Sequence, residues 1–587
     1  MTLNTVEQRS NRTDILEVGD AALLVDFRGQ GNALNSVHQL CEYLLANRPM
    51  WLLDVTPGID SLLVCLDFQS LEYERVRLAA RADLQFAIKK ILSSKKSQSK
   101  HERVYRIRVC YDPEIAPDLL SSAKKCKLTV REFINRHKNS KTFVDILGFM
   151  PGFAYCSGLD PSLRLPRLET PRTAVPPGSI AIAELQTGLY PQSTPGGWNV
   201  IGRTPDILFD ALRDPPNLLS AGARVEFIEI NLDEYKKIQA SLEKKNLGIE
   251  KRPHDVDNTI EVLSPGLLST VQDLPRYGYA HLALSPGGPV DLEGAVLANA
   301  LIGNPSNAVG LEITGIGPRL HFHVDTWVAW VGGNFEVKID DKSIFGNRPI
   351  RITRGQTLSF ASIRQGYRVF LAIAGGIEVQ SVLGRGGSHL SSGIGKKPLQ
   401  KGEFLRLSQP QHSDQIPLLK SMIDSGMIST KWSIAPPVAL TQKTQFIHAI
   451  PSLHFNLLST QEQELLWKTV WTISSQSNRM GMRLNSNFKI TSSISGIASQ
   501  GICFGTVQLP PSGEPILMLS EHQTTGGYPR LLEVVRSERS KLAQMRPGDK
   551  FQFIKTSLDE ADAANTLYFT NQIKTLNNIK NALLGNL

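Results

Sequence analysis

Cysteine is scarce in this chain of 587 residues, and the spacing of the cysteines bears on disulfide bonding and on zinc binding. The six cysteines are scattered, no two of them form a Cys-x-x-Cys pair, and no histidine cluster lies beside them. This spacing argues against a disulfide scaffold and against a zinc site. Dispersed thiols suit a reducing compartment, and we therefore expect a cytoplasmic protein.

Long apolar runs are also missing. No stretch reaches the roughly 18 apolar residues that predict a membrane helix, and the best candidate, residues 369–379, is interrupted by Gly375 and Gly376. Residues 1–14 are polar and lack the apolar core of a signal peptide. The sequence predicts no membrane partner.

Three familiar catalytic signatures are absent. A P-loop would need a glycine where Leu390 stands, five residues before Gly395. Neither a G-x-S-x-G nucleophile elbow nor an H-E-x-x-H zinc motif occurs. Any bound nucleotide must therefore occupy a site of another kind.

Charge is mildly unbalanced, with 64 Lys and Arg against 55 Asp and Glu, a net charge of +9. Much of the excess lies in residues 89–108 and 236–252, which lack the pattern of interleaved aromatic residues that stacks bases. We interpret both stretches as solvated linkers rather than a nucleic-acid surface. A positive balance also suits small anionic substrates.

Periodicity divides the chain into four parts. Residues 21–27 and 61–67 have the apolar pattern of strands and residues 37–46 that of a helix, which predicts a small α/β domain over residues 1–100. Short strands with frequent Gly and Pro follow in residues 101–235 and again in residues 259–587, and a helix is expected to close the chain after residue 558. We expect a charged linker at residues 236–258.

An internal repeat relates the two Gly- and Pro-rich parts. GSIAI (residues 178–182), QSTPGGW (192–198) and SAGARVEFI (220–228) recur in the same order as GTVQL (505–509), QTTGGY (523–528) and RPGDKFQFI (546–554). Repetition at this distance indicates duplication of a whole β-rich module rather than a solenoid. We therefore predict two related barrel-like modules, each with a Gly-Gly-aromatic turn in an equivalent position.

Several turns carry groups that could bind a ligand. GFMPGFAY (residues 148–155) is either a ligand contact or a hydrophobic turn packed on a barrel, and the arginine of PRTAVPPG (171–178) either forks onto an anion or forms a surface ion pair. The two Gly-Gly turns combine glutamine, hydroxyls and exposed backbone N–H groups, which favours binding of an anion. In the second half, turn-rich stretches supply Asp273, Arg276, Asp291, Arg479 and Arg483, which are either functional or turn-capping and surface residues.

These same stretches resemble two components of one enzyme. Residues 149–155, PRT (171–173), QTGLYP (186–191) and PGGWNVIGRTP (195–205) resemble the B component of 5-oxoprolinase, also called allophanate hydrolase subunit 1 or KipI. SPGLLSTVQD (264–273), GLEIT (310–314), AIAGGIEV (372–379), SNRMGMRL (477–484) and QTTGGYP (523–529) resemble its C component, also called allophanate hydrolase subunit 2 or KipA. The chain therefore resembles a natural B–C fusion.

The resemblance implies a mainly β fold with α+β character, in which two cyclophilin-like β-barrel modules follow the small α/β domain. It also implies that the chain works with a separate A component of 5-oxoprolinase (LamB/YcsF-like) to open 5-oxoproline to L-glutamate, with ATP and Mg²⁺ as cofactors. Two alternatives remain: a carboxyltransferase or allophanate-hydrolase-type enzyme acting with a biotin carrier, although this chain has no biotinyl AMKM segment, and a KipI-like inhibitor of a sensor histidine kinase. A homo-oligomer is compatible with either role.

The resemblance also carries over site residues. Those expected to take part in catalysis are His137, Arg203, Asp273, Arg276, Asp291 and Arg479. Those expected to bind substrate or nucleotide are Phe149, Pro151, Gly152, Arg172, Gln186, Thr187, Tyr190, Gly196, Gly197, Gln272, Glu312, Gln523, Thr524, Thr525, Gly526, Gly527 and Tyr528. We expect Arg203, Arg276 and Arg479 to meet anionic groups, and the three acidic residues Asp273, Asp291 and Glu312 to offer oxygen ligands to Mg²⁺.

The chain departs from the family pattern at three places in its C-like part. LGRGGS (residues 383–388) stands where the family has LGSRST, which displaces the arginine to Arg385. DLPRYGY (273–279) replaces DLGRPGY, and GGPVD (287–291) replaces SGAMD. We expect the pocket of this part to differ in detail from that of the family.

Overall fold

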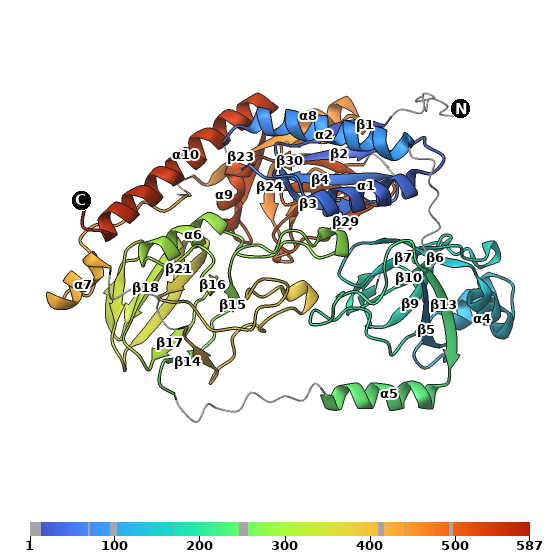
Figure 1. Cartoon of the computed structure of the whole chain (residues 1–587), viewed down its shortest axis with the longest axis horizontal. Helices are drawn as coiled ribbons and strands as arrows, with labels where there is room; N and C mark the ends of the chain where they lie inside the picture. Colours follow the sequence, from blue (N-terminus) through green and yellow to red (C-terminus); the bar gives the residue numbers. More distant parts are fainter. Residues whose placement is uncertain are drawn as a thin grey trace.

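The computed structural model describes residues 13–68, 71–93, 103–170, 172–245, 256–408, 416–438, 440, 442–491 and 497–586. Its strands form four larger sheets, which follow one another along the chain (Figure 1). Two of them are closed barrels, as the duplicated sequence predicts. The N-terminal domain lies over the second barrel, while the first barrel and an open sheet form opposite ends of the molecule.

The N-terminal domain is a four-stranded antiparallel sheet with the order β1(Asp14–Val18), β2(Ala22–Asp26), β4(Ser61–Leu66) and β3(Leu52–Pro57). Helices α1(Ala33–Asn47) and α2(Tyr73–Ser93) pack on one face, against Leu23, Val25 and Val64. The other face packs with Leu453 and Cys503 of the second barrel. Burial on both faces explains why β2 is apolar in its first four residues rather than alternating.

The two barrels have the same topology. Barrel 1 has the strand order β5-β12-β9-β10-β7-β6-β13 and barrel 2 the order β23-β30-β27-β28-β25-β24-β31. In each, the first and last of these strands pair in parallel and a helix joins the first strand to the sixth. The predicted duplication is confirmed, strand by strand.

The bounds of these elements follow the repeated motifs. Barrel 1 contains β5(Val104–Cys110), α3(Leu119–Lys125), α4(Val130–Asn139), β6(Thr142–Leu147), β7(Ala154–Ser157), β9(Ser179–Ala183), β10(Gln186–Leu189), β12(Asn199–Arg203) and β13(Arg224–Ile230). Barrel 2 contains β23(Thr444–Pro451), α8(Thr460–Lys468), β24(Val470–Ile473), β25(Gly481–Asn485), β27(Thr506–Gln508), β28(Ile516–Met518), β30(Arg530–Val534), η6(Arg536–Glu538), α9(Arg539–Gln544) and β31(Lys550–Lys555).

Each Gly-Gly turn lies beside its barrel, in a small two-stranded sheet. In barrel 1, β11(Thr194–Gly196) pairs with β8(Arg172–Val175), and in barrel 2, β29(Thr525–Gly526) pairs with β26(Gln500–Gly501). The two turns are therefore in equivalent positions, as the repeat predicts.

The remaining β-structure is an open nine-stranded sheet between the barrels in sequence, which the Gly- and Pro-rich pattern does not distinguish from a barrel. It comprises β14(Thr259–Ser264), β15(Leu268–Gln272), β16(Gly310–Thr314), β17(Arg319–Phe322), β18(Thr326–Ile339), β19(Lys342–Ile344), β20(Ile350–Ile352), β21(Thr357–Ile373) and β22(Phe404–Arg406). Helices α6(Leu292–Leu301) and α7(Pro417–Asp424) and the closing helix α10(Leu558–Leu583) share one apolar cluster with β18 and β21.

The two basic stretches are only partly linkers. Residues 89–93 end α2, residues 104–108 belong to β5, and residues 236–245 belong to α5(Leu232–Lys245). The correction has a simple cause: Leu232, Tyr235 and Ile238 recur with helical spacing and pack against Cys110 and Ile230 of barrel 1. Residues 94–102 and 246–255 lie outside the described residues.

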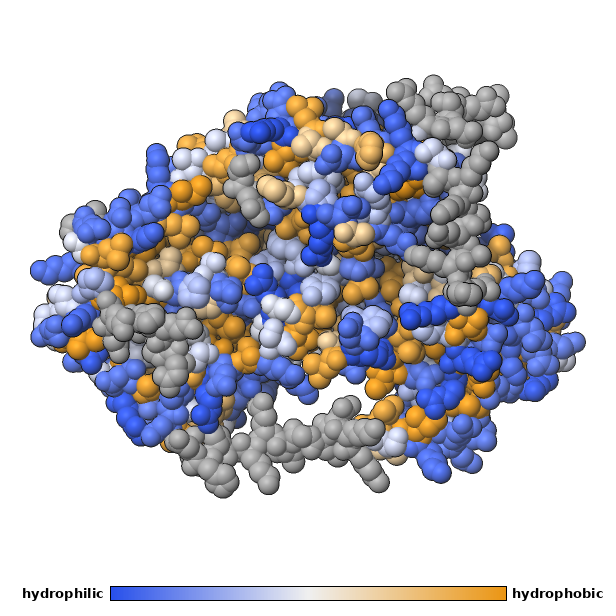
Figure 2. Space-filling view, in the orientation of Figure 1, coloured by the Kyte–Doolittle hydropathy of each residue, from blue (hydrophilic) through white to orange (hydrophobic). Residues whose placement is uncertain are grey.

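On the visible face, hydrophilic residues cover most of the barrel 1 end, and apolar residues occur in small groups (Figure 2). Within the described ranges, every helix is too short or too polar to cross a bilayer.

Candidate active site

A pocket of about 270 Å³ lies where three parts of the chain meet, and we call it the central pocket. The N-terminal sheet, the loop before α6 and barrel 2 with α10 each supply part of its wall. Its polar lining includes Asp54, Cys65, Tyr277, Glu293, Cys503, Ser520, His522, Arg536 and Arg539. Its volume is just below the roughly 300–1,000 Å³ of drug-sized sites, so it suits a small ligand.

Asp54 belongs to strand β3, which forms one end of the central pocket. Its side chain is almost fully buried. Its carboxylate accepts hydrogen bonds from the backbone N–H groups of Gly278 (2.8 Å), Ala280 (3.2 Å) and Val55 (2.9 Å). Burial raises the pKa of Asp54 to about 6, although these hydrogen bonds act in the opposite direction. A carboxyl that titrates near neutrality can exchange a proton with a ligand in the pocket.

His522 and the two thiols are uncharged in the pocket at neutral pH. Burial lowers the pKa of His522 to about 4, and its Nδ1 lies 2.8 Å from the carbonyl oxygen of Gln523. That contact requires Nδ1 to carry the proton, which leaves Nε2 as an acceptor. Burial raises the pKa of Cys503 to about 12 and that of Cys65 well above its ordinary value, so neither is a nucleophile near neutral pH.

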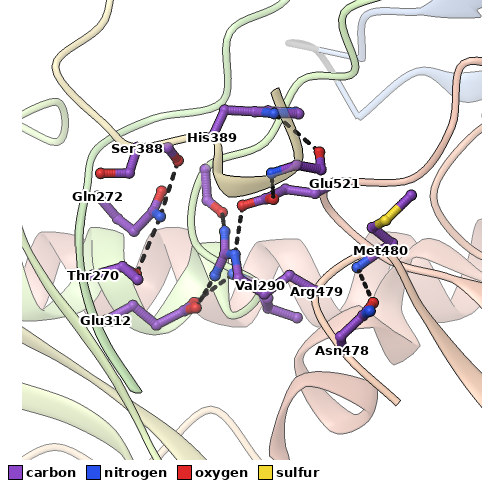
Figure 3. A network of polar contacts seen from close by, with 12 residues as sticks. Thr270, Gln272, Val290, Glu312, Ser388, His389, Asn478, Arg479, Met480 and Glu521 are labelled. Carbon is purple, nitrogen blue, oxygen red and sulfur yellow. Dashed lines mark hydrogen bonds and ion pairs between the residues drawn. The ribbon is translucent and has the colours of Figure 1, made fainter. Parts of the chain in front are cut away.

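A buried network of ion pairs lies next to the central pocket (Figure 3). Arg479, between β24 and β25, pairs with Glu312 of β16 and, at 2.6 Å, with Glu521. It also donates to the carbonyl oxygen of Gly288 (2.6 Å). Burial alone would lower the pKa of Arg479, but the two carboxylates raise it. Arg479 therefore joins barrel 2 to the nine-stranded sheet, and its anionic partners belong to this chain.

The carboxylates of the network hold the neighbouring loops. Glu312 accepts from the backbone N–H of Val290 (2.6 Å), and Glu521 from that of Ser391 (2.9 Å). Gln272, in the same region of Figure 3, donates to Thr270 (3.2 Å) and to the carbonyl oxygen of Ser388 (3.1 Å). The bond between Glu312 and Val290 fixes the part of the pocket wall that contains Val290.

Two of the departures from the family pattern contact one another. Asp273 accepts from the backbone N–H groups of Gly386 (2.9 Å) and Gly387 (3.0 Å), and Arg276 donates to the carbonyl oxygens of Val382 (3.0 Å) and Gly387 (2.8 Å). Gly387 has no room for a side chain, because a Cβ there would lie 2.6 Å from Asp273 Oδ1. The altered segments thus fit each other.

The structure separates the three acidic residues expected to share Mg²⁺. Asp291 caps α6 through Gly294 N–H (3.1 Å) and accepts from Ser540 (2.8 Å) and Gln544 (2.6 Å), whereas Asp273 and Glu312 are engaged as described above. Burial, together with Glu293, raises the pKa of Asp291 to about 6. Among the residues that the structure describes, no group of three or more His, Cys, Asp or Glu could hold a metal ion.

The Gly-Gly turn of barrel 2 contacts barrel 1. The hydroxyl of Thr525 accepts a hydrogen bond from the backbone N–H of Phe149 (2.9 Å), which has a left-handed φ of 67°. Gln523 donates to Gln508 (3.0 Å), and Thr524 Oγ1 is buried without a partner among the described residues. Gly526 lies against Gln508, Gly527 near Ile497, and Tyr528 is 36% exposed.

We expect Thr525→Val to lower the free energy of unfolding by about 1–2 kcal/mol, because it leaves the Phe149 N–H without its acceptor. Thr524→Val is the matched control: it removes a hydroxyl that makes no hydrogen bond in the described part of the chain, so stability should stay level or rise. Urea titrations of both variants test the pair. Equal losses would show that the Phe149–Thr525 bond does not join the two parts.

The Gly-Gly turn of barrel 1 is enclosed by aromatic rings and by the sheet beyond. Gln192 donates to the carbonyl oxygen of Ser392 (2.5 Å), Gly197 accepts from Leu168 N–H (2.7 Å), and a Cβ on Gly196 would lie 2.7 Å from the hydroxyl of Tyr190. Pro151 and Gly152 lie in the Phe149 turn, where a Cβ on Gly152 would meet Phe209. Neither Gly-Gly turn lines the central pocket.

The other residues of barrel 1 that are expected in the site make hydrogen bonds within the barrel or at its rim. Arg172 donates to Asp118 (2.6 Å), Arg203 to the carbonyl oxygen of Pro177 (2.9 Å), and Gln186 hydrogen-bonds to Asp145. His137 is fully buried: Nδ1 lies 2.8 Å from the Tyr111 hydroxyl and Nε2 3.3 Å from that of Thr187. The contacts of Arg203 and His137 are within barrel 1 and α5 and do not reach the central pocket.

His137 should make the fold sensitive to acid. Burial lowers its pKa to about 3, so between pH 7 and pH 5 the unfolded chain takes up the proton and the folded chain does not. Stability attributable to His137 is therefore lost as pH falls through about 6.5, by about 2 kcal/mol at pH 5. His137→Gln should lose that much less between these pH values. Phe227→Leu, which removes the ring stacked on His137 but keeps the histidine, is the control, and urea titrations at pH 7 and pH 5 should show the wild-type pH dependence for it.

A second cavity of about 670 Å³ lies between barrel 1 and the loops of the nine-stranded sheet. Gln192, Asp210, Glu378, Gln380 and Lys396 contribute to its lining. Lys396 is the cation in this lining, and it pairs with Glu403 at 2.7 Å.

Sequence reasoning missed Asp54, Ser520, Arg536 and Arg539 as residues of the site. Motifs identified in the sequence do lie close to these residues along the chain or in space. Parts of residues 275–290 and 520–522 line the pocket. The sequence signal for the arginines is only their spacing of three, at the starts of η6 and α9, and such a spacing is common on protein surfaces. Their meeting with Asp54 depends on segments nearly five hundred positions apart, which no local pattern predicts.

Comparison with known proteins identifies both parts of the chain. Residues 13–219 match the family model "Carboxyltransferase domain, subdomain C and D", and residues 282–555 match "Carboxyltransferase domain, subdomain A and B". The C component of 5-oxoprolinase from Escherichia coli (strain K12) is 32% identical over 51% of this chain and 93% of its own length. The B component from Bacillus subtilis (strain 168) is 34% identical over 38% of this chain and 95% of its own length.

The crystal structure of TTHA0988 has the same architecture, with 29% identity and a TM-score of 0.73 over 91% of this chain and 99% of that one. The predicted fold, two cyclophilin-like barrels after a small α/β domain, is confirmed. The chain belongs to the carboxyltransferase-domain family that includes the B and C components of 5-oxoprolinase, and it joins a B-like and a C-like part in one polypeptide.

Proposed function

We propose that the chain is the B–C component of an ATP-dependent 5-oxoprolinase, which opens the lactam of 5-oxoproline to L-glutamate together with a separate A component. The observation that carries the proposal is that both parts build one pocket. Asp54 comes from the B-like part, and Ser520 and Arg539 come from the C-like part. The chain also spans nearly the full length of a B component and of a C component.

The central pocket suits a small lactam with one carboxylate. Leu66, Phe68 and Pro286 provide apolar wall for a saturated ring, and the arginines provide donors for an anion. Asp54 is the group that can accept from a lactam N–H and exchange a proton near neutral pH. In this role the protein residues bind and orient the ring and exclude water from it.

Neither cavity fits Mg²⁺ and ATP together. The central pocket is below the size of a nucleotide site, the cation lining the larger cavity is paired with Glu403, and the described residues contain no acidic cluster for a metal. We therefore assign ATP to the complex with the A component, and ATP is expected to bind this chain weakly when that component is absent.

The test is phosphate release from ATP by the purified chain mixed with the A component, with and without 5-oxoproline. The expected result is release that requires both additions, with glutamate formed in equal amount. Release that does not depend on 5-oxoproline, with the A component shown to bind, would refute the proposal. Asp54→Asn should lower turnover at least tenfold, whereas Asp341→Asn, on the β18–β19 hairpin, is the control.

The family models favour one alternative, carboxyl transfer from a biotin carrier, because both are described as carboxyltransferase subdomains. Product formation that requires bicarbonate and a biotinylated partner would support this alternative. Turnover of 5-oxoproline with neither present would exclude it as the main activity.

A further inference from the structure

Three residues that line the central pocket each have a buried hydrogen-bonding atom without a partner among the residues that the structure describes. The atoms are Nη1 of Arg536, Nε of Arg539 and the hydroxyl oxygen of Ser520. Unpaired buried donors are destabilising, and native proteins rarely leave several of them together. Two of the three belong to guanidinium groups, so the missing partner is an acceptor with negative charge.

Each of the two arginines lies over at least one aromatic ring. The Arg536 guanidinium lies 4.8 Å from the ring centre of Phe68, 5.5 Å from that of Tyr73 and 5.0 Å from that of Phe569. Arg539 lies 4.7 Å from the ring centre of Phe504. Stacking on aromatic rings fixes the guanidinium planes while leaving their N–H groups free to bind at the edge.

The nearby carboxylates have other partners. Asp20 accepts from the backbone N–H of Arg536 (2.9 Å) and from Asn565 (2.7 Å), and Glu293 accepts from Ser540 (2.8 Å). Asp54 accepts from three backbone N–H groups, as described above. Burial lowers the pKa of Arg536; the negative charge of Asp20 opposes this effect, and the positive charge of Arg539 adds to it. An anion between the two arginines would counter the effects of burial and of Arg539.

We propose that Arg536 and Arg539, with Ser520 as a third donor, form the subsite that binds the carboxylate of the substrate in the central pocket. That the carboxylate is the one on 5-oxoproline rests on the proposed function. With the carboxylate at the arginines, the ring lies along the apolar wall, and its amide N–H is directed to the Asp54 side of the pocket. The pocket therefore selects lactams that carry an acid group.

The experiment is calorimetric titration of the full chain with three probes. They are 5-oxoproline, 2-pyrrolidinone (the same lactam without the carboxylate) and acetate (a carboxylate without the lactam). The variants are Arg539→Gln and Ser520→Ala, and the matched control is Arg546→Gln, an exposed arginine in the turn after α9. Thermal melts confirm that each variant is folded. If Arg539→Gln does not fold, Ser520→Ala still tests the subsite.

Arg539→Gln should weaken binding of 5-oxoproline by about tenfold to a hundredfold, and Ser520→Ala by about threefold to tenfold. Binding of 2-pyrrolidinone should be the same in all four proteins. Equal affinity of wild type and both variants for 5-oxoproline would overturn the subsite, even if turnover with the A component confirms the function. Acetate binding that depends on Arg539, in a chain that neither binds nor turns over 5-oxoproline, would support the subsite and refute the proposed substrate.

Discussion

Arg479→Ala is expected to lower the free energy of unfolding by about 3–5 kcal/mol, because it leaves Glu312 and Glu521 buried without their cation. Glu312 also holds the backbone N–H of Val290, which lines the central pocket, so the wall of that pocket should loosen as well. The measurement is a urea titration. Arg483→Ala, an exposed arginine four residues further on, in strand β25, is the matched control and should change stability by less than about 0.5 kcal/mol.

The result decides between two roles for Arg479. The sequence resemblance predicts that Arg479 binds an anionic group of substrate or nucleotide, whereas in the structure it pairs with two glutamates. A variant that keeps full stability but loses turnover would support the first role and contradict the ion network. A variant that loses stability, and loses turnover only where it is unfolded, supports the second.

Arg530→Met is expected to lower the free energy of unfolding by about 2–4 kcal/mol. Arg530 is 2% exposed and donates to Gln500 (2.8 Å) and to the carbonyl oxygen of Gly501 (2.9 Å), the two residues of β26. Removing the guanidinium leaves both acceptors buried and unpaired. Since β26 pairs with the Gly-Gly strand β29, amide hydrogen exchange at Thr525 should become faster at the same time.

Arg546→Met, at an exposed position near the end of the same barrel, is the control for the loss of a charge. Unchanged exchange at Thr525 in a destabilised Arg530→Met would show that β26 is held by the N-terminal sheet instead. That sheet does contact it closely, because a Cβ on Gly501 would lie 2.5 Å from Leu63.

Local pattern is enough to predict several of the elements and the duplication. Apolar runs locate β2 and β4, and Thr129 marks the start of α4 with a complete capping box. The repeat predicts two barrels with equivalent Gly-Gly strands because the same short motifs recur in the same order. Helix α5 escapes prediction because its charge conceals three apolar residues with helical spacing.

The candidate site is harder to predict, because charge type does not reveal a partner. Arg276 and Arg479 have the residue type that binds anions, but their partners are backbone carbonyls and glutamates from distant segments. Among the arginines that line the central pocket, Arg536 and Arg539 each keep a guanidinium nitrogen without a partner in the described part of the chain, and the neighbours of this pair come from strand β3, a loop near residue 277 and α10. Only the folded chain distinguishes an arginine that has partners from one that lacks them.

Because the B-like and C-like parts belong to one polypeptide, dilution affects their association differently from that of two separate proteins. Two separate proteins dissociate once their concentration falls below their dissociation constant, but parts of one polypeptide meet at an effective concentration that is typically of the order of millimolar. The central pocket, built from both parts, therefore stays assembled however dilute the protein becomes. Contacts such as Thr525 with Phe149 then set the alignment of the parts rather than their affinity.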